Sequence, residues 1–493
     1  MQNKLYLLYA ILLSWDMGAQ AQSQESALKD VMGGPLRTRA FAPTARAAVE
    51  MPEAVDNSTL PYFPPVIDQR GNSCAQASGI GYLYTYEVNR MLDRNALDSP
   101  ANRFAYQFSW NMVNGGEDEG GFVQEGLQLA QRYGIMTEAD YGTSATYQFR
   151  WATGYDKYLR AMQYRAHEIL TFDDSIPLMK RWLFDRGDGS LHGGLLAFSG
   201  QSTGWHIALD YDGPSLTGYH ALLTSLATSG AHAMTIVGYD DLISYTDSDG
   251  KTHTGAFIVT NTWGTYSHDN GRYYLPYDFF RNKDVPNSVL SHQVIALNVQ
   301  TYTPQVVMKV KVNYTSRNDL RFGFGCSDTR EAARPLQFRY SYAFYNQGGD
   351  YPMQGNGQDS EIELAFDLTN YLPNPTHAYP VYYLNILRSM IGKTKGEGQL
   401  VALSLLDYRN GNVTEWPCSD PLPKQLKDGE NVFSVRMPKQ TRVSTSPISY
   451  LDASDNANTG PLEVLDAEGK PYEVTFSNRD TKNQTITIRY QAE

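Results

Sequence analysis

One short stretch of the chain reads Pro64-Pro65-Val66-Ile67-Asp68-Gln69-Arg70-Gly71-Asn72-Ser73-Cys74-Ala75-Gln76-Ala77-Ser78, with a glutamine five positions before a cysteine. Residues 70–73 have the composition of a turn, and Asn72 or Ser73 is suited to cap a following helix. The sequence predicts that this helix begins at Cys74. Apolar residues recur behind it at helical spacing, namely Ala77, Ile80, Tyr84, Val88 and Met91.

A cysteine at the start of a helix has a distinct chemistry. The helix dipole and the free backbone N–H groups favour an anion there, so we expect a lowered pKa for Cys74 and a reactive thiolate near neutral pH. Gln69 is placed to direct its side-chain amide at an oxyanion formed beside the sulfur. The alternative is a small buried cysteine without reactivity, and segments further along the chain argue against it.

Two strand-like apolar segments in the middle of the chain carry a histidine and an asparagine. The first, residues 230–241, has His232 near its start, and the second, residues 256–264, contains Asn261 and Trp263 near its end. An imidazole can take a proton from a thiol, and an asparagine oxygen can hold the imidazole ring without adding charge. His206 and His220 lie in the same half of the chain but head no such strand.

The connection between these two segments contains Asp247-Ser248-Asp249-Gly250. We favour a hairpin turn over a calcium loop here, because no glutamate closes a calcium site of the usual spacing. Helices are predicted over residues 123–133 and 175–185, and a buried strand over 193–198.

Taken in order, these segments resemble the papain family of cysteine peptidases. Gln69 and Cys74 resemble its oxyanion and nucleophile motif, and His232-Ala233 resembles its base motif. Asn261-Thr262-Trp263 resembles its orienting asparagine with a tryptophan cover. The resemblance covers about residues 61–298. It implies a two-lobed α+β peptidase domain with protein or peptide substrates, no cofactor and no metal.

The same resemblance implies which residues bind the substrate. The backbone of Gly120 and Gly121 would pair with an extended peptide. Phe122, Val123 and Ala233 would line an apolar pocket for the second residue before the cleaved bond, and Trp263 would complete the substrate-binding set. The chain departs from the family pattern at Ala75, where an aromatic residue is usual, and in the glutamine, which stands one residue closer to the cysteine.

The function that this sequence predicts is that of an exported cysteine endopeptidase, with Cys74 as nucleophile, His232 as base and acid, Asn261 as orienting residue and Gln69 in the oxyanion site. Two alternatives belong to other classes. One is a catalytically inactive binding protein that keeps the scaffold, and the other is a thiol-dependent amide-transfer enzyme. The presence of the cysteine, histidine and asparagine together favours the peptidase.

The first residues have the pattern of a signal peptide over 1–21. Lys4 precedes an apolar run at 5–13, and Ala19-Gln20-Ala21 is a cleavage pattern. The run is shorter than the ~20 residues of a membrane span, so we expect export to the periplasm, the cell surface or the medium, and no membrane span. Residues 22–60 read as a disordered leader or a short pro-segment over the active site.

The pattern changes after the predicted peptidase domain at 61–300. Residues 308–312, 361–366 and 485–490 alternate between apolar and polar, which predicts a β-sandwich over 301–440 and a small β module or an extension of the sandwich over 441–493. We expect these strands to bury their own core, so that a chain ending near residue 300 keeps its activity. A glycan or protein ligand of the sandwich is a further prediction.

Charge and cysteine content narrow the remaining possibilities. The net charge of −12 argues against nucleic-acid binding, which usually needs a basic face. The other two cysteines, Cys326 and Cys418, both lie in the C-terminal region, and the sequence leaves open whether they form a disulfide.

Overall fold

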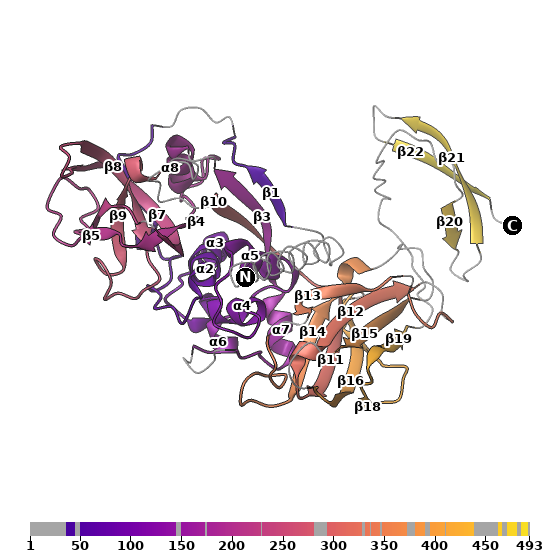
Figure 1. Ribbon diagram of the computed structural model, residues 1–493. Coiled ribbons are helices and arrows are strands. Elements are labelled where there is room, and N and C mark those ends of the chain that lie inside the picture. Colours follow the sequence, from indigo (N-terminus) through magenta and orange to yellow (C-terminus); the bar gives the residue numbers. More distant parts are fainter. Residues whose placement is uncertain are drawn as a thin grey trace, which may run out of the picture.

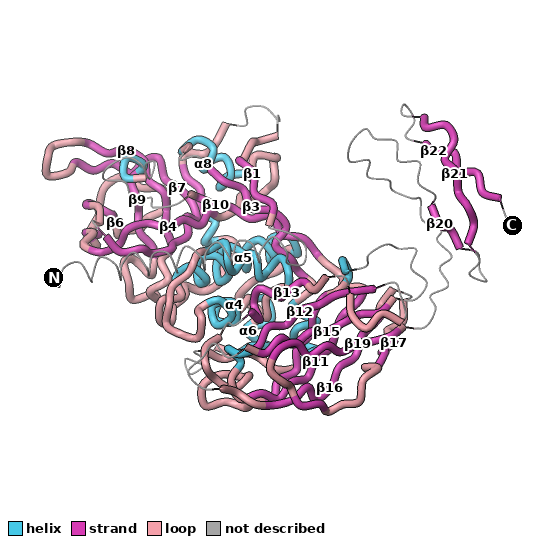
Figure 2. The backbone as a smooth tube through the Cα atoms, turned by 45° about the vertical axis from the view of Figure 1, so that its right-hand side comes forward, coloured by secondary structure: helices cyan, strands magenta, loops and turns pink. Residues whose placement is uncertain are grey.

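A computed structural model gives the arrangement of the chain (Figures 1 and 2). The predicted signal peptide at 1–21 lies outside the described residues, as does most of 441–493. The structure describes residues 36–44, 50–143, 149–172, 175–227, 229–280, 293–327, 331–335, 337–345, 348–371, 380–389, 395–409, 411–437, 462–465, 471–480 and 485–491.

A ten-stranded sheet is the frame of the N-terminal half. Its strands are β1 (Arg37–Ala40), β2 (Ala54–Asp56), β3 (Tyr164–Phe172), β4 (Leu196–Thr203), β5 (His206–Ala208), β6 (Leu222–Ser225), β7 (Ser229–Thr246), β8 (Thr252–Thr260), β9 (Arg272–Pro276) and β10 (Val294–Thr301). They follow the order β1-β3-β10-β4-β7-β8-β9-β6-β5, and β2 pairs with β7 off this path.

Helices cover both faces of this sheet. They are α2 (Cys74–Gln76), the π-helical η2 (Ala77–Tyr84), α3 (Thr85–Leu92), α4 (Tyr106–Val113), α5 (Val123–Arg132), α6 (Glu138–Tyr141), α7 (Tyr155–Ala161) and α8 (Ile176–Asp185), with short 3₁₀ turns η1 (Asn57–Thr59), η3 (Pro100–Asn102) and η5 (Tyr277–Phe279). Alternate residues of the strands supply two separate cores. Ile169 and Ala197 join the core beneath η2 and α5, whereas Leu170 and Leu196 join the core beneath α8.

The helix predicted from Cys74 is present and runs without a break through α2, η2 and α3. The predicted apolar residues from Ala77 to Val88 are fully buried. The predicted side-chain cap is wrong. Ser73 Oγ donates to the carbonyl of Arg70 (2.6 Å), and Asn72 Nδ2 donates to the carbonyl of Asp118 (2.7 Å). Both side chains therefore stabilise the turn, and neither accepts a hydrogen bond from an N–H group at the start of the helix.

The other local predictions of the N-terminal half are confirmed with small shifts. Helix α5 lies within 123–133 and α8 within 175–185, and the predicted strand at 193–198 begins later, at Leu196. Strands β7 and β8 form the expected hairpin. Asp247 Oδ1 accepts the backbone N–H groups of Asp249 (3.0 Å) and Lys251 (2.9 Å), so this carboxylate shapes the turn.

The segment predicted as a leader contributes to the sheet. Strand β1 pairs in parallel with β3, and β2 pairs antiparallel with β7. Phe41 stacks on Phe172 and meets the edge of Trp182. The described parts of 22–60 therefore belong to the sheet and are not a disordered leader, whereas a pro-segment over the active site stays a prediction. Parallel pairing with a strand more than a hundred residues away leaves no local signal in the sequence.

The C-terminal region forms the predicted β-sandwich. Its strands are β11 (Val306–Tyr314), β12 (Leu320–Ser327), β13 (Arg339–Tyr345), β14 (Glu361–Asp367), β15 (Val381–Arg388), β16 (Gly398–Asp407), β17 (Thr414–Pro417), β18 (Lys424–Gln425) and β19 (Gly429–Arg436), with 3₁₀ turns η6 (Arg317–Asp319) and η7 (Thr369–Tyr371). One sheet has the order β14-β11-β16-β17 with β18 beside β16, and the other has the order β13-β12-β15-β19. Phe324 of one sheet packs on Phe366 of the other, with ring centroids 4.5 Å apart.

Three further strands, β20 (Leu462–Leu465), β21 (Pro471–Asp480) and β22 (Thr485–Gln491), form a separate three-stranded sheet. All three cysteines lie in described segments, and no disulfide joins any two of them. The possible bridge between Cys326 and Cys418 is therefore not formed. The α+β class is confirmed by a helix-and-sheet half followed by sheets alone.

The sandwich packs directly on the helical part of the N-terminal half, which lies between the ten-stranded sheet and the sandwich (Figures 1 and 2). Trp151 is fully buried against Phe344, with ring centroids 5.0 Å apart. Arg317 lies 4.2 Å over the Trp151 ring and donates to the carbonyl of Phe149 (2.6 Å). One apolar core runs through both parts. An independently folded sandwich stays a prediction, and this shared core argues against it.

Two polar contacts reinforce the same interface. Arg165 Nη2 lies 3.1 Å from Asp367 Oδ2 in a buried ion pair. Tyr133 and Ser341 share a buried hydrogen bond of 2.5 Å between their hydroxyls. Over the part of the chain that the structure describes, no helix is long and apolar enough to cross a membrane.

Candidate active site

Cys74 begins the helix that lies against β7. Its side chain is half-buried, and the backbone of Ala233 in β7 hydrogen-bonds to the sulfur. Burial raises the pKa of the thiol above its ordinary value, and the backbone N–H groups of Ala233, Ala75 and Cys74 oppose this rise only in part. The lowered pKa expected from the helix start is therefore not found, because the loss of water around the sulfur outweighs the helix end.

His232 lies beside Ala233 near the start of β7. Its Nε2 atom is 2.8 Å from Asn261 Oδ1, and its ring stacks on Trp263 with centroids 4.4 Å apart and planes inclined by 22°. Asn261 directly follows β8, which pairs with β7. Burial lowers the pKa of His232, while the hydrogen bond with Asn261 raises it in part.

The hydrogen bonds fix the orientation of the Asn261 amide. The backbone N–H of Thr262 donates to Asn261 Oδ1 over 2.7 Å. A backbone N–H can only donate, so the atom facing it must be the amide oxygen. Nε2 of His232, which faces the same oxygen, must then carry the proton. Its Nδ1 atom keeps a lone pair that can accept a proton from a thiol.

The helix that carries Cys74 also holds the two strands. Ser78 Oγ donates to the carbonyl of Met234 in β7 (2.9 Å). Tyr82 OH donates to the carbonyl of Asn261 (2.9 Å) and accepts the N–H of Ile67 (2.7 Å). The sequence reading missed both residues. Their helical spacing from Cys74 was visible, but not the strands that they meet.

Gln69 lies beside the segment that follows β8. Its backbone N–H donates to the carbonyl of Thr262 (2.7 Å), and its Oε1 atom accepts the hydroxyl of Thr262 (2.5 Å). Its Nε2 atom donates to the carbonyl of Gly71 (2.8 Å). An amide has two N–H groups, so the second remains to serve as the predicted oxyanion donor.

The predicted substrate-binding glycines lie next to the cysteine turn. A Cβ atom on Gly120 would come 3.7 Å from the carbonyl oxygen of Asn72. Asp118, which sequence reasoning missed, ties the two segments together by accepting the backbone N–H of Asn72 at Oδ1 (2.8 Å). The backbone of Gly120 and Gly121 is exposed, and Glu125 accepts the N–H of Phe122 (2.8 Å).

The predicted pocket side chains differ in their exposure. Phe122 is 56% exposed, whereas Val123 is 4% exposed and Ala233 is 2% exposed. Val123 packs closely on the helix, because a Cβ atom on Gly79 would come within 2.6 Å of its Cγ1 atom. Trp263 is half-buried over His232. Phe122 is thus the member of the set with the most surface available for contact with a ligand.

The rival histidines have other partners. Nδ1 of His206 is 2.7 Å from Thr224 Oγ1, and Nδ1 of His220 is 3.0 Å from the carbonyl of Tyr211. In the described segments, no group of three or more histidine, cysteine or acidic side chains is placed to hold a metal ion.

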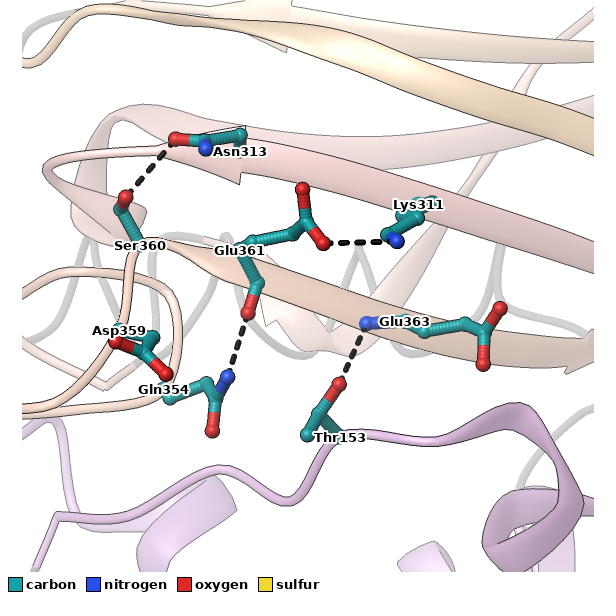
Figure 3. A pocket seen from close by; sticks show the side chains of 8 residues that line it. All are labelled: Thr153, Lys311, Asn313, Gln354, Asp359, Ser360, Glu361 and Glu363. Atoms are coloured by element: carbon teal, nitrogen blue, oxygen red, sulfur yellow. Dashed lines mark hydrogen bonds and ion pairs between the residues drawn. The ribbon is translucent and has the colours of Figure 1, made fainter.

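A polar pocket of about 370 Å³ lies where the sandwich meets Thr153 of the N-terminal half (Figure 3). Its charged and polar groups bond to one another. Lys311 pairs with Glu361 (2.8 Å), Ser360 donates to Asn313 (2.9 Å) and Gln354 donates to the carbonyl of Glu361 (2.6 Å). A ligand of the sandwich therefore stays a prediction. The lining residues are Thr153, Lys311, Asn313, Gln354, Asp359, Ser360, Glu361 and Glu363.

Solved structures to which this chain is similar include papain-like cysteine proteases. Xylellain, a cysteine protease from Xylella fastidiosa, is 17% identical with a TM-score of 0.35, covering 54% of this chain and 91% of its own. A procathepsin B from Trypanosoma congolense is 17% identical with a TM-score of 0.36, covering 54% of this chain and 87% of its own. The bromelain protease from Ananas comosus is 16% identical with a TM-score of 0.33, covering 50% of this chain and 99% of its own. No family model and no curated protein matches the chain.

Proposed function

We propose that this protein is a cysteine peptidase that hydrolyses peptide bonds through Cys74, His232 and Asn261. The observation that carries the proposal is the arrangement around β7. The sulfur of Cys74 receives a hydrogen bond from the backbone of Ala233, and the neighbouring His232 holds Asn261 Oδ1 at 2.8 Å. A thiol, an imidazole and an orienting amide in this order suit nucleophilic attack on a carbonyl group.

In this proposal the reaction begins with a neutral thiol and a neutral imidazole, which is the direction in which burial shifts the pKa of Cys74 (raised) and of His232 (lowered). As the sulfur attacks the carbonyl carbon, the thiol proton passes to Nδ1 of His232. The electron pair of the C=O double bond moves to oxygen, where the backbone N–H of Cys74 and the second amide N–H of Gln69 stabilise it. Loss of one such donor weakens transition-state binding by about 3 kcal/mol.

The tetrahedral intermediate then collapses. The C=O bond re-forms, the C–N bond breaks, and the imidazolium of His232 gives its proton to the departing amine. A thioester remains on Cys74. Water attacks the carbonyl carbon of this thioester while His232 accepts a proton from the water. The C–S bond then breaks, the carboxylic acid leaves, and the imidazolium of His232 returns its proton to the sulfur. Asn261 stabilises the imidazolium because its oxygen faces Nε2 throughout.

The substrate is an extended peptide that pairs with the backbone of Gly120 and Gly121. Export belongs to the same proposal and is supported by the signal-peptide pattern at residues 1–21. Attack of an external amine in place of water would give the amide-transfer activity, so product analysis separates the two reactions.

The test compares Cys74→Ser with Cys418→Ser, because Cys418 is also half-buried and free. Both variants and the wild type are incubated with a peptide library and with an epoxysuccinyl thiol reagent. We expect new peptide ends and labelling from the wild type and from Cys418→Ser, and neither from Cys74→Ser. More than about a hundredth of the wild-type activity in Cys74→Ser would exclude Cys74 as the nucleophile. Isopeptide products would establish amide transfer, and an unreactive wild type would establish a binding protein.

A further inference from the structure

Asn261 has a second polar end that the proposed mechanism does not use. Its side chain is fully buried, and its oxygen already receives the protons of His232 Nε2 and of the Thr262 backbone. The amide nitrogen, Nδ2, lies 2.9 Å from Nε2 of His268. A buried amide N–H without an acceptor is destabilising, so this contact is a required part of the arrangement.

The tautomer of His268 follows from the same bonds. Since the Thr262 N–H fixes which end of Asn261 is oxygen, Nδ2 is a donor towards His268. Nε2 of His268 must therefore accept, and the proton of its neutral ring must be on Nδ1. His232 and His268 thus have opposite tautomers on the two ends of one amide.

The ring of His268 is held in place by aromatic side chains. Its centroid lies 5.2 Å from that of Tyr273, 6.0 Å from that of Trp205 and 6.2 Å from that of Trp263. Burial, together with the charge of His232, lowers the pKa of His268 to about 4. The ring is therefore neutral, and able to accept a hydrogen bond, around neutral pH.

The backbone at His268 is also unusual. Its φ angle is +53°, in the left-handed region that a residue with a Cβ atom seldom adopts. Such a conformation persists where surrounding contacts favour it, and it is common at functional sites. Here it occurs in the loop between Asn261 and β9, in the residue whose ring meets the orienting amide.

We propose that His268 is a positioning residue that holds the amide of Asn261 with its oxygen towards His232. Rotation of this amide by half a turn would place Nδ2 against the N–H groups of His232 and Thr262 and leave the oxygen to face His268. Because Nε2 of His268 accepts a hydrogen bond from Nδ2 of Asn261, His268 opposes that rotation. This inference rests on the proposed function, because it assigns His268 a part in orienting the base of the same reaction.

The kinetic test replaces His268 by a ring without an acceptor and by a shorter acceptor. His268→Phe keeps the aromatic packing but cannot accept a hydrogen bond, whereas the amide oxygen of His268→Gln can. We expect His268→Phe to lower kcat about 10-fold with KM unchanged, and His268→Gln to remain within about threefold of the wild type. His206→Phe, at a histidine that bonds to Thr224 and not to Asn261, is the control and should leave both constants near the wild-type values.

Equal losses in His268→Phe and His268→Gln would overturn the inference, because packing alone would then explain them. A His268→Phe variant with wild-type kcat would overturn it as well.

A spectroscopic test does not depend on turnover. Nitrogen NMR of the imidazole rings in the intact protein at neutral pH should show the Nδ1–H tautomer for His268 and the Nε2–H tautomer for His232. A charged His268, or one protonated at Nε2, would overturn the inference even in an active peptidase. If Cys74→Ser kept its activity, the proposed function would fall, while the tautomer of His268 would still decide whether it orients Asn261.

Discussion

Breaking the ion pair between Arg165 and Asp367 tests how much the interface with the sandwich contributes to the stability of the protein. Arg165 lies in β3, and Asp367 ends β14 of the sandwich. Their side chains are 2% and 10% exposed, with 3.1 Å between nitrogen and oxygen. Replacing Asp367 by Asn leaves the guanidinium buried without a counter-charge, and burial already lowers the pKa of Arg165.

The size of the effect follows from burial. Breaking a buried pair on one side destabilises a protein by ~3–5 kcal/mol. Lys311–Glu361 is a matched control within the sandwich, with 2.8 Å between its atoms and side chains that are 37% and 44% exposed. Glu361→Gln should change stability far less than Asp367→Asn, because water screens this exposed pair.

Urea unfolding followed by circular dichroism and by tryptophan fluorescence measures both variants. We expect one transition common to the two probes and a lower midpoint for Asp367→Asn, because one core runs through both parts. An Asp367→Asn variant that loses no more stability than Glu361→Gln would refute the buried ion pair. Two separate transitions in the wild type would refute the shared core.

Three further predictions concern activity. The pH profile of kcat/KM should be a broad bell that falls in acid as His232 gains a proton and falls in alkali as Cys74 loses one. The bell is broad because burial lowers the pKa of His232 and raises the pKa of Cys74. A profile that only climbs through the pKa of a free thiol would contradict this prediction. A chain ending at residue 300 should be insoluble or inactive, since it uncovers Trp151, and a soluble active fragment would show that the interface is dispensable. Cleavage of a peptide library should favour Leu, Val or an aromatic residue two positions before the cut, where Phe122 offers an uncharged surface, and a dominant Arg or Asp there would disprove the pocket.

Sequence patterns predicted the parts of the site that depend on local spacing. The helix from Cys74 and the β7–β8 hairpin could both be predicted, because each lies in a short segment with a clear pattern of apolar residues. Burial was not visible in this way. The pKa of Cys74 depends on how closely β7 covers the sulfur, which no residue near position 74 encodes.

His268 shows a different reason for failure. It stands only seven positions after Asn261, and a histidine in a loop of mostly small and polar residues was a weak signal. Its contact with the amide depends on a left-handed backbone that histidine does not favour. The interface with the sandwich was hidden for another reason. Trp151 lies in a loop before α7 and Phe344 lies in β13, so no periodic pattern connects the two residues.

The shared core also bears on how the protein is made. Ribosomes add residues from the N-terminus, and Asp367 follows Arg165 by 202 positions. At ~5–20 residues per second, about 10–40 s pass before the carboxylate that neutralises Arg165 has been synthesised. For most of this interval Trp151 lacks Phe344, which covers it in the folded protein, and the growing chain exposes apolar surface there. A polypeptide whose translation stops before Asp367 lacks the complete interface, and quality-control proteases can recognise the surface that it leaves exposed.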